Sequence, residues 1–155
     1  CVFAFEPNPK HSAHQRTLES AYRRMGWRYH FIAAGVSDLT GTMTFYANAG
    51  FRDGRGNEEW GFSTTNFEPA NPDNKPQVVP VLDLASWIQI HVLSRSIPSQ
   101  LPVIGGEPTT PAIAMKMDIE GMEYRVMTKQ ILSGVACKID LILCEFHNEL
   151  QVPGI

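Results

Sequence analysis

Short apolar runs alternate with helical patterns along the chain. The apolar runs are bounded by turn residues and predict strands at Val2–Phe5, Trp27–Val36, Met43–Tyr46, Val78–Leu82, Ala112–Met117 and Ile139–Cys144. Apolar residues at helical spacing predict helices over His11–Met25, from Leu84 to Val92 and over Met122–Ser133. Gly26 and Gly134 suit the C-terminal caps of the first and third helix, and Asp83 suits the N-cap of the second.

Strands that alternate with helices are typical of βαβ units, so the pattern predicts an α/β fold with a doubly wound, mostly parallel sheet. The near-continuous apolar runs favour strands that are covered on both faces. The length of 155 residues suits a single domain. The same periods predict a set of buried side chains: Leu18, Tyr22, Trp87, Ile88, Met115, Val126, Ile131, Leu141 and Leu143.

Two long segments show little periodicity. Residues 47–77 and 97–111 are rich in glycine, proline, asparagine or aspartate, which is typical of loops. A loop as long as 47–77 is uncommon in a compact domain unless it has a function or moves. We expect residues 47–77 to be the least ordered interior segment.

Composition narrows the class of partner. Apolar residues make up 43% of the chain and charged residues 19%, and the formal net charge is -3, which argues against a nucleic-acid partner. No run approaches the ~18 apolar residues of a membrane-spanning helix. The cysteines, Cys1, Cys137 and Cys144, have the spacing of neither a disulfide framework nor a zinc site. The default expectation is therefore a reducing, cytoplasmic compartment, and the oligomeric state is left open.

Polar residues follow the predicted strands where those strands end: Glu6, then Ser37 and Asp38, then Asp118 and Glu120, and finally Glu145 and His147. In an open α/β sheet, ligands bind at the carboxyl ends of the parallel strands. The alternation therefore predicts that these side chains gather at one edge of the sheet.

Each of these residues has more than one interpretation. Glu6 could bind the ribose of a nucleoside cofactor or be a solvated turn residue. Asp118 and Glu120 could bind a metal, act as a general base, or complement the dipole of the following helix. His147 could accept a proton near neutral pH, or simply be a polar residue at a strand end. Glu123 is expected on the surface of its helix or behind the residues that contact ligand.

At these positions the sequence resembles the FkbM methyltransferase family. The most specific string is Lys-Met-Asp-Ile-Glu-Gly-Met-Glu at 116–123; other matching strings are Val-Phe-Ala-Phe-Glu-Pro-Asn-Pro at 2–9, Ala-Gly-Val-Ser-Asp at 34–38, Val-Leu-Asp-Leu at 81–84 and Glu-Phe-His at 145–147. The resemblance implies a Rossmann-like class I methyltransferase fold with S-adenosylmethionine as methyl donor. It also implies O-methylation of a hydroxyl on a sugar or another small molecule, with a glycan or small molecule as acceptor.

The resemblance also assigns roles by position. Glu6 resembles the ribose-binding acid, and Val36, Ser37 and Asp38 resemble the segment beside the adenine. Asp118 and Glu120 would lie near the methionine moiety and the reacting centre. For the base that takes the acceptor proton, we favour His147, with Asp118 as the other candidate. No metal is assigned on this hypothesis.

One expected part of the family pattern is absent. The glycine-rich turn that holds the amino-acid end of the cofactor would precede residue 1, and the strands expected after residue 147 are missing or truncated. We therefore expect residues 1–155 to be one partial methyltransferase domain, which by itself binds cofactor weakly or not at all.

Three alternatives remain at this point. A nicotinamide-dependent oxidoreductase would use Glu6 equally well, but it leaves the 116–123 string without a role. A divalent-metal-dependent transferase or hydrolase would use Asp118, Glu120, Glu145 and His147 as ligands. The third alternative is an interaction domain that keeps the fold and has lost activity.

Overall fold

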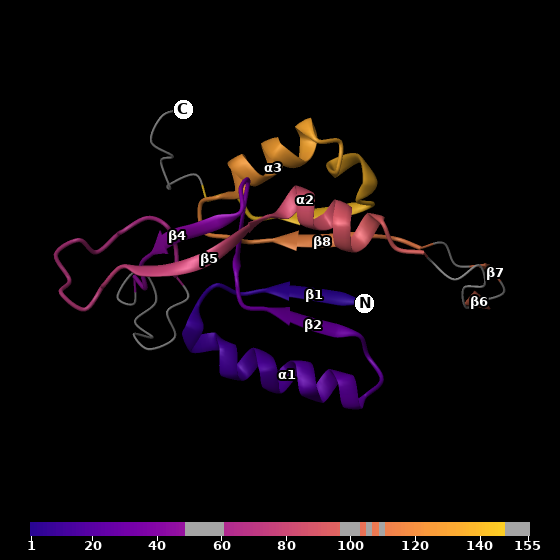
Figure 1. The fold of residues 1–155 in the computed structure, drawn as a ribbon, viewed down its shortest axis with the longest axis horizontal. Helices are drawn as coiled ribbons and strands as arrows, with labels where there is room; N and C mark the ends of the chain where they lie inside the picture. The colour runs from indigo at the N-terminus through magenta and orange to yellow at the C-terminus, as the bar shows by residue number, and fades with distance from the viewer. Residues whose placement is uncertain (49–60, 97–102, 105–106, 109–110, 148–155) are drawn as a thin grey trace.

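Strands and helices alternate along the chain (Figure 1). The computed structural model describes residues 1–48, 61–96, 103–104, 107–108 and 111–147. The helices are α1 (Ser12–Arg24), α2 (Leu84–Ile88) and α3 (Glu123–Leu132); short 3₁₀ turns cover Pro9–His11 and Ala136–Lys138, and a π-helical turn, Gln89–Leu93, extends α2. No described helix is long and apolar enough to cross a membrane.

Two pairs of parallel strands are each joined by a helix. β1 (Val2–Phe5) pairs with β2 (Tyr29–Ile32), and α1 connects these two strands. β8 (Ala114–Met117) pairs with β9 (Leu141–Cys144), and α3 connects them. Figure 1 shows α1 beside β2 along the bottom of the molecule and α3 along the top. These two units have the strand–helix–strand form that the sequence pattern predicts.

The remaining strands form two further sheets. β5 (Gln77–Asp83) pairs in parallel with β3 (Gly35–Ser37) and antiparallel with β4 (Gly41–Phe45). β6 (Val103–Ile104) and β7 (Glu107–Pro108) form a small antiparallel pair within the segment predicted as the 97–111 loop. The expected α/β class is confirmed, as a mixed fold with several small sheets, some of them parallel.

The predicted single strand over Trp27–Val36 is wrong, because the chain changes partners within it. It pairs with β1 as far as Ile32, and from Gly35 onward it pairs with β5. A Cβ atom on Gly35 would lie 3.2 Å from Val81 Cγ1 and 3.3 Å from Phe45 Cζ. The absence of a side chain at residue 35 therefore permits the close approach of β3 to its neighbours.

The larger cluster of buried apolar side chains lies between α2, α3 and the strands. It comprises Val36, Leu84, Ala85, Ile88, Met117, Met122, Val126 and Val135. A smaller cluster beside it contains Phe45, Phe62, Val79 and Val81 from the antiparallel pair and the loop that joins it. The predicted N-cap is confirmed, because the Asp83 side chain accepts hydrogen bonds from the backbone N–H groups of Ala85 and Ser86.

The predicted buried set is correct only in part. Ile88 and Val126 are buried, and Leu18, Tyr22, Trp87 and Met115 are half-buried. Ile131, Leu141 and Leu143 are 61%, 51% and 57% exposed, so their prediction is wrong. Leu141 and Leu143 share the more exposed face of β9. On α3 the buried positions are Glu123, Val126 and Gln130, which turns Ile131 outward.

Asn48 organises the described part of the 47–77 loop; residues 49–60 lie outside the described residues. Its side chain is buried and donates to the carbonyl oxygens of Gly61 and Thr65, at 2.9 Å each. Its amide oxygen accepts from Phe67 N and from Asn74 Nδ2, at 3.0 Å each. Asn48 has a φ of 47°, in the left-handed region that asparagine tolerates better than most residues. Long-range hydrogen bonds therefore hold this described part in place.

We expect Asn48→Gly and Asn48→Ala to destabilise the fold, by about 1–3 kcal/mol for each buried group left without a partner. Ala should cost about 1–2 kcal/mol more than Gly, because only Gly tolerates the left-handed backbone. Denaturant unfolding measures both, and Asn71→Ala, at an exposed turn of the same loop, is the matched control. Equal stability of wild type and both variants would show that the Asn48 hydrogen bonds do not contribute to the free energy of unfolding.

Candidate functional site

The turn after β8 carries two of the predicted site residues. Asp118 and Glu120 follow the last strand residue, Met117, and Glu120 and Gly121 both have positive φ values, 54° and 108°. A left-handed conformation is unfavourable for glutamate, so contacts elsewhere must hold it. Those contacts come from the first residue of α3.

Glu123 supplies them through a fully buried carboxylate. Its side chain is 0% exposed, and Oε1 accepts from the backbone N–H of Ile119 at 3.2 Å. Gly121 N–H lies 3.0 Å from Oε2 and 3.2 Å from Oε1. A buried carboxylate is costly unless it is hydrogen-bonded, and these amides meet that need. The expectation that Glu123 lies on the helix surface is wrong. The alternative expectation, that it lies behind the residues that contact ligand, stays a prediction.

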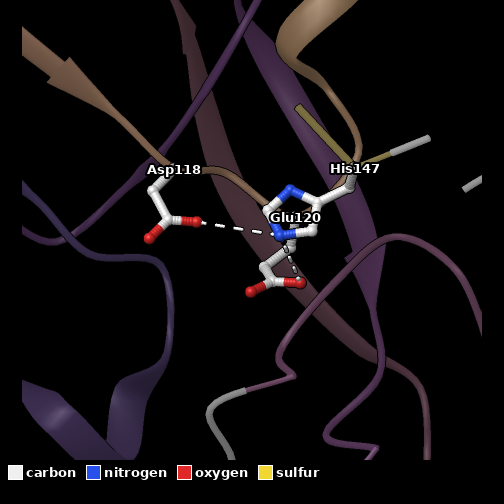
Figure 2. Close-up of side chains that lie close together, drawn as sticks. All are labelled: Asp118, Glu120 and His147. Carbon is white, nitrogen blue, oxygen red and sulfur yellow. Dashed lines mark ion pairs between the residues drawn. The ribbon is translucent and has the colours of Figure 1, made fainter. Parts of the chain in front are cut away.

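His147 completes the cluster from the end of β9. Its Nδ1 lies 2.8 Å from Glu123 Oε1, and its side chain is mostly buried. The opposite nitrogen, Nε2, lies 3.7 Å from Glu120 Oε2 and 3.9 Å from Asp118 Oδ1 (Figure 2). Glu145 Oε1 is also 3.9 Å away, on a side chain that is largely exposed. The structure thus brings together the predicted residues at the ends of β8 and β9.

The charges in this cluster act on one another. Burial opposes protonation of His147, but the hydrogen bond to Glu123 and the negative charges of Glu120, Glu123 and Asp118 outweigh it and raise the pKa of the imidazole. Burial, with the charges of Asp118, Glu123 and Glu145, raises the pKa of Glu120 against the opposing charge of His147. The cluster therefore favours a cation or a proton at Nε2.

The same geometry has room for a metal ion. Asp118, Glu120 and His147 each offer one ligand atom, and these atoms lie within 4.8 Å of one another. The separations from Nε2 are too long for hydrogen bonds. Oxygen-rich ligand sets with one imidazole suit several divalent ions. A lone pair on Nε2 can serve a metal or a proton, but not both at once.

The 36–38 segment lies against the same helix. The Val36 and Ser37 side chains are buried, and the Ser37 hydroxyl donates to Asp38 Oδ1 at 3.1 Å. Arg125 Nη2 on α3 donates to Asp38 Oδ2 at 3.0 Å. Burial alone would raise the pKa of Asp38, but the hydrogen bonds from Arg125 and Ser37 hold it below its usual value. Within this segment only Asp38 is half-buried rather than buried, so a ligand would meet Asp38 before Val36 or Ser37.

Glu6 stands apart from the His147 cluster. Its Oε1 accepts the backbone N–H of Asn8 at 2.8 Å, and its Oε2 lies 3.3 Å from His11 Nδ1. The carboxylate remains partly exposed, so it keeps lone pairs for a ligand. The turn after β1 lies close to β3, since Pro7 Cβ is 3.5 Å from the position of a Cβ on Gly35.

Sequence reasoning missed the part played by Glu123 and by Arg125. A signal for Glu123 is present, because it occupies the same helical stripe as Val126 and Gln130, at spacings of three and seven residues. A search for apolar periodicity does not find that stripe, because two of its three members are polar. Arg125 carries no comparable signal, because its contact with Asp38 joins residues 87 positions apart.

We expect NMR of the imidazole to show a His147 pKa above that of an ordinary histidine. Since the folded-state pKa is raised, the proton stabilises the fold fully below the unfolded pKa, and this contribution is lost as pH rises through the folded midpoint. Wild type should thus exceed His147→Gln in unfolding free energy most at acidic pH. An advantage that instead grows with rising pH would contradict the assignment.

Comparison with known proteins identifies the family. The methyltransferase FkbM domain matches residues 1–151, which is nearly the whole chain and includes every residue of the cluster. Neither the curated proteins nor the solved structures gave a significant match. The extent of the match confirms the resemblance seen in the sequence, and the chain belongs to the FkbM methyltransferase family.

Proposed function

We propose that this protein transfers a methyl group from S-adenosylmethionine to a hydroxyl oxygen of a sugar or another small molecule. The observation that carries the proposal is the cluster of Asp118, Glu120, Glu123 and His147 at the carboxyl ends of β8 and β9, in a chain of the methyltransferase family. On this proposal the small sheets belong to one Rossmann-like, doubly wound arrangement. The parallel units β1–α1–β2 and β8–α3–β9 support it.

The residues at the ends of β1 and β3 suit a nucleoside cofactor. Glu6 is a partly exposed carboxylate at a strand end, and its oxygens can accept ribose hydroxyls in addition to their present contacts. The nearby segment of Val36, Ser37 and Asp38 would lie on the adenine side, with Asp38 as its most accessible member. Asp118 and Glu120 would face the methionine end and the acceptor. When bound, S-adenosylmethionine supplies a methyl group that is already activated for transfer.

The chain then has two tasks at the acceptor end. Asp118 and Glu120 hold the acceptor so that its oxygen lies in line with the methyl carbon, and such positioning can supply much of the rate. An alcohol is a weak nucleophile, so His147 takes its proton at Nε2 as the new bond forms. Only the neutral imidazole can do this. Because the His147 pKa is raised, activity should fall on the acid side at a higher pH than an ordinary histidine would give.

The cofactor role of Glu6 is tested by Glu6→Gln, which keeps an acceptor for the Asn8 amide and removes the charge. A charged hydrogen bond is worth about 1.5–3 kcal/mol, so S-adenosylmethionine should bind about 10–100-fold more weakly by calorimetry. Glu68→Gln is the control, because Glu68 lies in the 47–77 loop and binds Asn71 at an exposed site. Unchanged affinity in a folded Glu6→Gln protein would remove Glu6 from the cofactor site.

The role of His147 is tested by His147→Gln. Loss of a general base should lower kcat by ~10²–10⁴-fold while affinity for S-adenosylmethionine stays nearly the same. His14→Gln, at an exposed position of α1, should leave both unchanged. Full turnover of His147→Gln together with an inactive Asp118→Asn would assign the base to Asp118. Activity that is lost with a chelator and restored by a divalent ion would favour a metal at the same three side chains.

A further inference from the structure

We propose that Glu123 is a positioning residue for the methyl transfer, because its buried carboxylate holds both the His147 ring and the turn that presents Asp118 and Glu120. This inference rests on the proposed function, since it acts through His147. It concerns a residue that lies behind the reacting groups. Three features of the cluster support this role: the orientation of the ring, the contacts that hold the turn, and the charges that surround both.

The first feature is the orientation of the imidazole ring. The Glu123 carboxylate accepts hydrogen bonds from two backbone N–H groups. We infer that it also accepts the proton of His147 Nδ1, which lies 2.8 Å from Oε1. A neutral imidazole carries one ring proton, and a proton on Nδ1 leaves the lone pair on Nε2. Nε2 is the nitrogen that faces Asp118 and Glu120 (Figure 2). Glu123 therefore selects the tautomer that a base needs on that side.

The second feature is the hold on the turn after β8. Glu123 accepts from Ile119 and Gly121, the residues on either side of Glu120, whose backbone is left-handed. Without that carboxylate, the N–H groups of Ile119 and Gly121 would lose the partner that they share. One buried side chain on α3 thus ties the end of β8 to the end of β9. The separation between Nε2 and the partly exposed carboxylates of Asp118 and Glu120 depends on both ties.

The third feature is the set of ionisable groups around the ring. Asp118 and Glu120 face it from the turn, Glu145 and Cys144 belong to the end of β9, and Lys116 on β8 pairs with Asp118 at 3.2 Å. Burial, with the charges of Glu123 and Asp118, raises the pKa of the Cys144 thiol, which keeps it neutral.

Among the described residues of this set, Glu123 is the one within hydrogen-bond distance of the ring. The nearest oxygens of Glu120, Asp118 and Glu145 lie 3.7, 3.9 and 3.9 Å from Nε2. Removal of Glu123 therefore has a consequence that removal of the others lacks, because it frees the ring to rotate and to change tautomer.

The test compares Glu123→Gln, His147→Gln and the double variant. Glu123→Gln keeps the size of the side chain and an acceptor for the turn, but lacks the charge that favours a proton on Nδ1. We expect kcat to fall about 10–100-fold with little change in the KM for S-adenosylmethionine. In the His147→Gln background the same substitution should have almost no further effect, since Glu123 acts through His147. A full additional loss in the double variant would overturn the proposal.

NMR of the imidazole nitrogens gives a readout that needs no turnover. Wild type should show the neutral ring protonated on Nδ1, and Glu123→Gln should show a larger share protonated on Nε2 and a lower titration midpoint. Glu123→Asp, which keeps the charge, should lie between the two. A wild-type ring protonated on Nε2 would overturn the assignment even if no variant folds. The expected tautomer shift in a protein that transfers no methyl group would uphold Glu123 as a positioning residue and reject the reaction.

Discussion

The arrangement of the site depends on one fully buried carboxylate. Glu123 is fully enclosed at the start of α3, and the protein compensates for its desolvation with backbone N–H groups and one imidazole nitrogen. The requirement for hydrogen-bond donors to this carboxylate explains the unusual backbone of the preceding turn. Glu120 and Gly121 adopt left-handed conformations, which places the N–H of Gly121 against the carboxylate. The turn, the ring and the helix start are thus one hydrogen-bonded unit.

Local signals in the sequence were sufficient for the parts of the fold that depend on local rules. The apolar runs located β1, β5, β8 and β9, and the helical spacing located α1 and α3 to within a few residues. Asp83 caps α2 as predicted, and Gly26 and Gly134 have the positive φ expected after a helix. Polar residues at the ends of parallel strands are expected to lie together, and the structure places Asp118, Glu120, Glu145 and His147 close to one another. All of these follow from period, capping or strand direction.

The errors arise where tertiary contacts override the local pattern. The run over Trp27–Val36 is apolar throughout, so nothing in it shows that the partner strand changes after Ile32. The helical spacing predicts that Ile131 is buried, yet Gln130 beside it takes the buried position on α3. The hydrogen bonds between Asn48 and Asn74, 26 residues apart in the 47–77 segment, are likewise invisible to a local pattern. The low order expected of that segment stays a prediction. The pattern of one sequence holds no information about contacts between residues that are distant along the chain.

The helix α3 connects the two halves of the proposed active site. Glu123 holds His147 at the proposed acceptor side, and Arg125, two residues later, holds Asp38 at the end of β3, on the proposed adenine side. Lys129 adds a third contact, 3.4 Å from Asp83 at the end of β5. These side chains set α3 against the carboxyl ends of three strands through charged hydrogen bonds, which are more directional than apolar packing. A displacement of α3 would therefore disturb the acceptor side and the cofactor side together. For a reaction that requires a donor carbon and an acceptor oxygen to lie in line, a common support for both sides limits the error in their relative position.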